Sequence, residues 1–297
     1  SKTVLLLVLA ALGVTAALAQ GPASSPRGAE PVAEARTAAI ERQVQRAFEA
    51  LSSQPDQARR LADEALVALA HNPDVDLEVR TRTLLCEYFN ERDPEAAERE
   101  LRALRALVPK LRLAALGVGV LACDGELKEQ SGDNAAALAF YDQAVALAER
   151  VHDQARLADA LHLRGFLRAV VGGYPAALSD LTRALSLHEA AGQPGDARNV
   201  LTSVASLYSR MGATEEARQH YETVLRSIPD GPASRERLMA QYNLGRSLEP
   251  LVRWDEAQHW YALALAQGRE LGDLRGQLHA LRGLGVRVAL AQDGGSP

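Results

Sequence analysis

Four stretches of the chain repeat one helical pattern at a constant interval. An alanine recurs at each step, a large apolar residue follows four positions later, and a small residue follows after three more. Positions i, i+4 and i+7 share one face of an α-helix, so each stretch predicts a helix with one apolar face. The three sets are Ala137, Ala177, Ala217 and Ala257; Tyr141, Leu181, Tyr221 and Tyr261; and Ala144, Ala184, Val224 and Ala264.

A second helix is predicted before each of these, because small residues recur there at the same interval. They are Gly125, Gly165, Ala205, Gly245 and Gly285. A small side chain lets the neighbouring helix approach closely, and turn residues such as Gly132-Asp133 separate the two helices. No segment has convincing strand-like alternation, and aromatic residues make up only 4% of the chain. We therefore expect an all-α chain of antiparallel helix pairs.

The pattern resembles the tetratricopeptide repeat, which has a Leu-Gly step and a tyrosine in its first helix and an alanine and an aromatic residue in its second. The best match is "QYNLGRSL" followed by "RWDEAQHWYALAL". The interval is longer than the family's usual length of about 34 residues, the opening aromatic residue is mostly leucine, and the closing proline is mostly missing. The resemblance implies a right-handed superhelical solenoid over residues 37–292, with six hairpins and the first helix of a seventh. It also implies that the first helices line the concave face.

Residues 1–19 have the features of an export signal. Lys2 precedes an apolar run, from Val4 onward, that closes on the small-x-small pattern Ala17-Leu18-Ala19. Such a run falls short of the roughly 20 residues that a helix needs to cross a bilayer. Residues 20–36 are rich in glycine, proline and serine, and they predict a flexible linker. We expect export to a bacterial periplasm with the signal removed; an uncleaved signal anchor is the alternative.

Sequence motifs for catalysis, metal ligation and nucleotide binding are missing. "GVGVLA" at residues 117–122 fits a dinucleotide fingerprint, but that motif must follow a strand and the preceding segment is helical in pattern. The seven histidines form no ligand pair at helical spacing. The formal charge of −5, with acids and bases interleaved, provides no basic patch for nucleic acid. We expect neither an enzyme nor a metal, cofactor or nucleic-acid site in this chain.

The chain has two cysteines, Cys86 and Cys123, which fall in the first helices of consecutive repeats. Adjacent first helices run side by side in a solenoid of this kind, so the two thiols come within reach of one another. In an oxidising compartment they would form a disulfide that links two repeats. The alternative is two unpaired cysteines that act as small apolar side chains.

A polar stripe along the first helices predicts a ligand-binding groove. On the helix around Ala205 the stripe lies opposite the residues that pack on the partner helix, and the repeat extends it to the next two first helices. Further upstream the same surface becomes apolar. The candidate groove residues are Asn199, Thr202, Ser203, Ser206, Arg210, Tyr242, Asn243, Arg246, His279, Arg282 and Phe166. The alternative is an inner face that is merely solvated.

Three arginines in the stripe indicate the chemistry of a ligand. Hydrogen bonds from arginine to carboxylate are charge-assisted and comparatively strong, so we expect an acidic peptide segment or a free C-terminal carboxylate. Asn243 and Arg246 also resemble part of the carboxylate-clamp repeats that grip peptide C-termini. Thr202 and Ser206 depart from that motif, which has a lysine–asparagine pair in the preceding first helix.

Helical repeats of this type bind proteins or peptides and rarely catalyse reactions. The export signal and the "LGD" turn at residues 271–273 resemble the N-terminal sensor regions of bacterial diguanylate cyclases with GGDEF output domains. This resemblance implies a periplasmic sensor in a membrane-anchored signalling protein; a free periplasmic adaptor or assembly factor is the alternative. Residues 293–297 resemble an inter-helix turn, so we expect the chain to stop inside a seventh pair, with any output domain and membrane segment beyond it.

Overall fold

The small residues of the repeat lie where the helices meet. The computed structural model describes residues 29–293 apart from residues 52–53 and 91. Ala137, Ala177 and Ala217 are fully buried. A Cβ atom added at Gly125 would lie 2.3 Å from the ring of Tyr141, so this helix pair packs at a distance that only glycine allows. Helix–helix contact therefore explains why small residues recur at these positions.

Thirteen α-helices follow one another within the described residues, and no strand is present among them. They are α1 (Ala29–Leu51), α2 (Pro55–His71), α3 (Val75–Asn90), α4 (Pro94–Leu107), α5 (Gly117–Gln130), α6 (Asn134–Arg150), α7 (Gln154–Val170), α8 (Tyr174–Ala190), α9 (Pro194–Arg210), α10 (Thr214–Ser227), α11 (Arg235–Leu248), α12 (Trp254–Leu271) and α13 (Leu274–Asp293). Two short 3₁₀ helices, η1 (Val108–Lys110) and η2 (Ala114–Leu116), separate α4 from α5. The predicted fold class, an all-α right-handed solenoid of antiparallel helix pairs, is confirmed.

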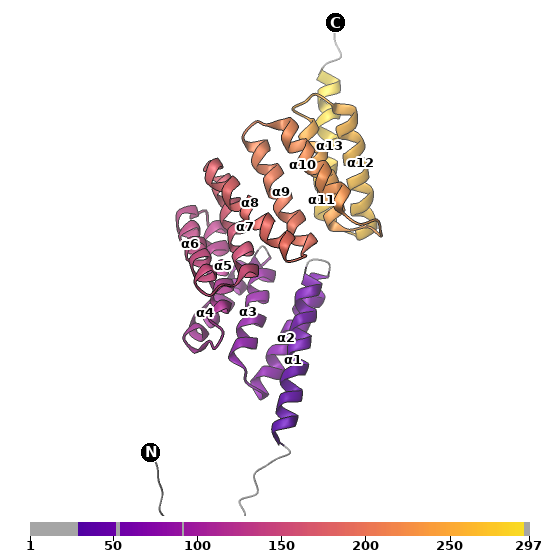
Figure 1. The fold of residues 1–297 in the computed structure, drawn as a ribbon. Coiled ribbons are helices and arrows are strands. Elements are labelled where there is room, and N and C mark those ends of the chain that lie inside the picture. Colours follow the sequence, from indigo (N-terminus) through magenta and orange to yellow (C-terminus); the bar gives the residue numbers. More distant parts are fainter. Residues whose placement is uncertain (1–28, 52–53, 91, 294–297) are drawn as a thin grey trace, which may run out of the picture.

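The stack curves, with the odd-numbered helices on its inner side (Figure 1). Each helix packs on the next in the chain, and α1, α3, α5, α7 and α9 also contact one another in sequence, as α11 and α13 do. Even-numbered helices have no comparable contact with each other in the part of the chain described, so they are spread along the outer side. The regular pattern is interrupted once, because α9 and α11 make almost no backbone contact.

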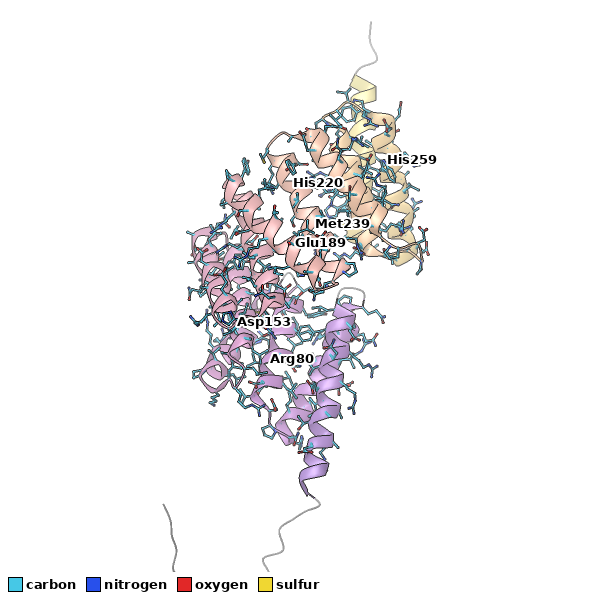
Figure 2. The ribbon with its side chains drawn as sticks, in the orientation of Figure 1. Arg80, Asp153, Glu189, His220, Met239 and His259 are labelled. Atoms are coloured by element: carbon cyan, nitrogen blue, oxygen red, sulfur yellow. A yellow bond between two sulfur atoms is a disulfide. The ribbon has the colours of Figure 1, made fainter. Side chains whose placement is uncertain are left out.

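A left-handed backbone residue recurs at regular intervals, at the turns between helices. Helices α6, α7, α8 and α9 are each 17 residues long, and three residues separate each from the next. Two consecutive helix–turn modules therefore make up one sequence repeat, such as the one from Ala137 to Ala177. Asp153, labelled in Figure 2, accepts a hydrogen bond from the Arg156 amide at 3.0 Å and caps α7. The residues with positive φ at the turns are Gly132, His152, Gly172, Gly192, Gly212, Val252 and Gly272.

The disulfide between Cys86 and Cys123 links α3 to α5, two inner helices that lie side by side. Their Cα atoms are 6.3 Å apart, and both side chains are buried among the apolar residues of the same core cluster. The structure thus brings together the two cysteines that the repeat places in consecutive first helices. The bond joins the second helix pair to the third.

The ends of the repeat region differ in part from the prediction. Helix α1 begins at Ala29, inside the stretch expected to be a linker, because alanine, glutamate and arginine are strong helix formers and are frequent from that point on. The expected signal (1–19), the first part of the expected linker (20–28) and residues 294–297 lie outside the described residues. Asp293, expected in a turn, is the last residue of α13. None of the helices described is both long and apolar enough to span a bilayer.

Candidate functional site

On α9 the predicted groove residues divide between solvent and the packed interior. Asn199 and Arg210 are exposed, and Thr202 and Ser206 are half-buried. Ser203 is only 8% exposed, and its hydroxyl lies 2.8 Å from Nε2 of His162 on α7. Its side chain therefore faces the neighbouring inner helix instead of the open groove, because α7 and α9 lie side by side.

His162 stays uncharged at neutral pH in this contact. Burial, together with the nearby His188, lowers the pKa of His162 to about 4. The imidazole and the Ser203 hydroxyl form a neutral hydrogen-bonded pair between α7 and α9. This pair supports the inner wall and adds no charge to it.

On α11 and α13 the predicted residues form a connected cluster. The Tyr242 ring lies 5.3 Å from the His279 ring, and the Arg246 guanidinium lies 5.9 Å from the centre of the Tyr242 ring. Arg282 is exposed on the same face of α13, three residues after His279. Phe166 is 38% exposed on α7, a helix that makes no substantial contact with α11 or α13. The structure therefore unites the C-terminal half of the predicted groove and leaves Phe166 apart from it.

The three arginines of the predicted groove have no carboxylate within ion-pair distance among the described residues: Arg210, Arg246 and Arg282. Several other arginines on the inner helices are neutralised. Arg164 and Arg168, for example, both bind the buried Asp180 carboxylate at 2.7 Å. The C-terminal half of the inner face thus carries uncompensated positive charge, which favours an anionic ligand.

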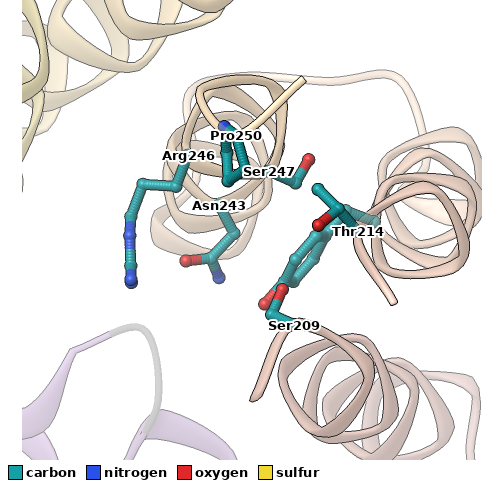
Figure 3. A pocket seen from close by; sticks show the side chains of 7 residues that line it. Ser209, Thr214, Asn243, Arg246, Ser247 and Pro250 are labelled. Atoms are coloured by element: carbon teal, nitrogen blue, oxygen red, sulfur yellow. The ribbon is translucent and has the colours of Figure 1, made fainter. Parts of the chain in front are cut away.

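A cavity of about 100 Å³ opens beside this cluster, between the α9–α10 turn and α11 (Figure 3). It lies where the contact between inner helices is interrupted. Asn243 and Arg246 were predicted as groove residues, whereas the remaining five were not. Figure 3 shows Asn243, Arg246 and Ser247 extending from α11, with Ser209 and Thr214 on the facing segments. The lining residues, none of them acidic, are Ser209, Thr214, Tyr221, Asn243, Arg246, Ser247 and Pro250.

The inner face around α7 carries a group of acidic residues, a feature that the sequence prediction missed. The Asp159 side chain on α7 is 66% exposed. Protein nevertheless surrounds it on the concave side, and the reduced solvation of the carboxylate raises the pKa of Asp159 to about 6. The neighbouring Asp196 raises this pKa further, and His188, with Nε2 at 3.7 Å from the carboxylate, opposes the shift. Enclosure and the charge of Asp159 also raise the pKa of Glu87 on α3. The concave side therefore brings together acidic residues from α3 and α7, which belong to different helix pairs.

No metal-binding arrangement occurs in the described part of the chain, where no three histidine, cysteine, aspartate or glutamate side chains converge suitably. The residues of the inner face can donate hydrogen bonds, pair with charges and pack on aromatic rings. This arrangement suits the binding of an extended polar ligand.

Comparison by sequence identifies one repeat. The family model described as Tetratricopeptide repeat matches residues 200–236, which run from α9 to the start of α11. No curated protein matches the sequence.

Comparison by structure finds helical-repeat proteins that cover most of the chain. BtubC (BKLC) from P. vanneervenii has a TM-score of 0.56 at 16% identity, over 81% of this chain and 92% of its own. A Rap protein complexed with Competence and Sporulation Factor has a TM-score of 0.58 at 14% identity, over 85% and 88%. NprR in complex with its cognate peptide NprX has a TM-score of 0.58 at 17% identity, over 86% and 74%. The chain is a tetratricopeptide-like helical-repeat solenoid, and its repeat at residues 200–236 matches the tetratricopeptide repeat family.

Proposed function

We propose that this chain is a non-catalytic scaffold that binds a peptide, or an extended segment of a protein, along its concave face. The observation that carries the proposal is the set of three inner-face arginines that have no acidic partner among the described residues. An unpaired guanidinium can form a charge-assisted hydrogen bond with a carboxylate supplied by a ligand. Two structures with a similar fold, those of Rap and NprR, were determined with a bound factor or peptide, which supports the same use of this fold.

The polarity of the inner face suggests how a peptide would be oriented. Acidic side chains gather near Asp159 on α7, and unpaired arginines occupy α9, α11 and α13. A peptide with a basic or amino-terminal end and an acidic or carboxyl-terminal end would match both halves in one direction only. We propose that the acidic end of the ligand lies toward α13.

Charge reversal on the inner face tests the binding proposal. Peptides are selected from a displayed random library on the immobilised chain, and the affinity of each is measured by calorimetry. Replacing Arg210, Arg246 and Arg282 together by glutamate should weaken selected peptides at least about tenfold. The matched control makes the same charge change at three exposed arginines of outer helices: Arg150, Arg226 and Arg269. Equal affinity in the two triple variants would refute binding at the inner face.

We further propose that the chain is exported and serves as the periplasmic sensor region of a membrane-anchored signalling protein of the diguanylate cyclase type. The composition of residues 1–19 and the disulfide, a bond typical of oxidising compartments, support export. A free periplasmic adaptor for envelope proteins is the second candidate. Fusing residues 1–36 to a reporter that is active only after export tests localisation. Coupling the peptide-binding assay to a full-length cyclase assay separates the sensor from the adaptor.

A further inference from the structure

Two repeats contain the same pair of a buried tyrosine and a half-buried glutamate. The Tyr141 hydroxyl donates to Glu129 Oε2 at 3.0 Å, and the Tyr261 hydroxyl donates to Glu249 Oε1 at 2.5 Å. In each pair the glutamate precedes the tyrosine by 12 residues, at the end of the inner helix. Both tyrosine side chains are almost completely buried, so the carboxylate supplies the one partner that each hydroxyl needs.

The repeat between them keeps the tyrosine and lacks the glutamate. Tyr221 has the same register as Tyr141 and Tyr261, but the residue 12 positions before it is Ser209. In the repeat where leucine replaces the tyrosine, Leu181, the matching residue is Ala169, and no polar group needs a partner. Only the Tyr221 repeat therefore combines a buried phenol with a missing carboxylate among the four repeats that carry this pattern.

Of the described residues, arginines but no carboxylate act on Tyr221, whereas a carboxylate lies beside each of its two counterparts. Tyr221 is 7% exposed, and its hydroxyl lies beside the hydroxyls of Ser206 and Ser209. Burial raises the pKa of Tyr221, and the charged groups that face it, Arg246 and Arg210, oppose that rise. Burial raises the pKa of Tyr141 as well, but there the charged groups, Glu129 and Glu126, add to the rise. The two arginines near Tyr221 therefore favour a negative charge at this place, and none of the residues that line the adjacent cavity is acidic.

The space for that charge is the cavity of about 100 Å³ next to Tyr221. Such a volume holds several water molecules and therefore a carboxylate group. Ala205 stands where the other tyrosine-bearing repeats have glycine, and a Cβ at Gly245 would lie 2.8 Å from the Tyr261 ring. The Tyr221 ring consequently cannot adopt the position of its counterparts, which helps to keep the cavity open. Asn243 and Arg246 line its other side.

We propose that this cavity is a carboxylate-binding subsite, in which a ligand carboxylate replaces the glutamate that the Tyr221 repeat lacks. The Tyr221 hydroxyl and the Arg246 guanidinium donate to it, and the Asn243 amide and the Ser209 hydroxyl supply further donors. The carboxylate is either the C-terminus or an acidic side chain of a bound peptide. This subsite rests on the proposed peptide-binding function for its biological role, and its chemistry can be tested without the natural peptide.

The decisive variant restores the missing group from within the chain. Ser209→Glu introduces a carboxylate at the position occupied by Glu129 and Glu249 in the other repeats, and Ser209→Gln is its uncharged control of the same length. We expect Ser209→Glu to raise the thermal midpoint above that of the wild type and of Ser209→Gln, because the new carboxylate pairs with Arg246 and Tyr221. An equal or lower midpoint than Ser209→Gln would contradict a site selective for negative charge.

Three small probes test the ligand chemistry by NMR titration of the ¹⁵N-labelled chain. N-acetylglycine presents a C-terminal carboxylate, N-acetylaspartic acid α-amide presents a side-chain carboxylate, and N-acetylglycinamide presents neither. We expect at least one carboxylate probe to shift the side-chain amide signal of Asn243 and to bind the wild type at least about tenfold more tightly than the neutral probe. The preferred carboxylate probe identifies the source. Ser209→Glu should abolish this preference, whereas Ser209→Gln should retain part of it.

The possible outcomes separate the subsite from the general function. Equal binding of charged and neutral probes, or no binding of any probe to the wild type at about 50 mM, overturns the subsite. Selected peptides that bind the wild type and Ser209→Glu equally well also overturn it, while peptide binding itself stands. Failure of every library peptide to bind the wild type would instead refute the proposed function.

Discussion

Breaking the Cys86–Cys123 disulfide should loosen one end of the solenoid and leave the other intact. The bond closes a loop with a sequence separation of 37 residues. In the chain-entropy treatment, a cross-link of that span stabilises the folded state by about 4 kcal/mol. Reduction removes the cross-link and leaves both buried sulfur atoms in place. It therefore measures the cross-link alone, whereas replacing both cysteines by alanine adds the loss of packing.

Hydrogen exchange of backbone amides can show where that free energy is lost. Repeat proteins are stabilised mainly by contacts between neighbouring units, so a local loss is expected to stay local. Amides in α3 and α5 should exchange up to about a thousandfold faster after reduction, which is what about 4 kcal/mol corresponds to at roughly 1.4 kcal/mol per factor of ten. Amides in α11 and α12 should keep their rates.

Two controls make the result interpretable. The Cys86→Ala, Cys123→Ala double variant should exchange like the reduced wild type or faster, and adding reductant to it should change nothing. Unchanged exchange in α3 and α5 after reduction would show that the cross-link does not stabilise this end. Equal acceleration in every helix would show that the chain unfolds as one cooperative unit, which would refute the reasoning from neighbouring contacts.

Three further substitutions test the packing and the charges of the inner face. Gly125→Ala should destabilise the chain by about 1–3 kcal/mol in chemical denaturation, because its Cβ would overlap the Tyr141 ring; a neutral effect would contradict the close approach. Asp159 has a raised pKa of about 6, so its contribution to stability falls as pH rises from about 4 to 6. Asp159→Asn should therefore raise the thermal midpoint more at pH 8 than at pH 4, and an equal gain at both would argue against the shift. His162 has a lowered pKa of about 4, so its contribution falls as pH drops from 6.5 toward 4. His162→Gln should flatten the pH dependence of the midpoint over that range, and an unaltered profile would exclude His162 as its source.

The elements of the fold were predictable because their signal is local. Helical periodicity fixes which residues share a face, and the constant repeat interval fixes which faces are equivalent. The alanines at positions 137, 177, 217 and 257 were predicted to lie on the packed face, and all four are buried. The close approach at Gly125 follows from the same pattern. Stacked repeats bury these small residues whatever the overall curvature of the stack.

The electrostatic character of the inner face could not be predicted in the same way, since it depends on that curvature. Small rotations between successive helix pairs bring Glu87 of α3 near Asp159 of α7, and no interval in the sequence encodes this distance. The same packing turns Ser203 toward His162. The cavity residue Ser209 is a different case. A comparison of each repeat tyrosine with the residue 12 positions before it would have singled out this serine.

The spacing of the turns also determines how this solenoid can be lengthened or shortened. Left-handed turn residues recur once per helix–turn module, so every junction from Gly132 to Gly212 has the same geometry. Removing one such module would preserve the turns but convert every later inner helix into an outer one, because inner and outer helices alternate. Removing two modules would restore the alternation and shorten the concave face by one inner helix. Insertions and deletions should therefore involve an even number of modules. Only then do the arginines of the C-terminal repeats stay on the concave face together with the carboxylates of the N-terminal repeats.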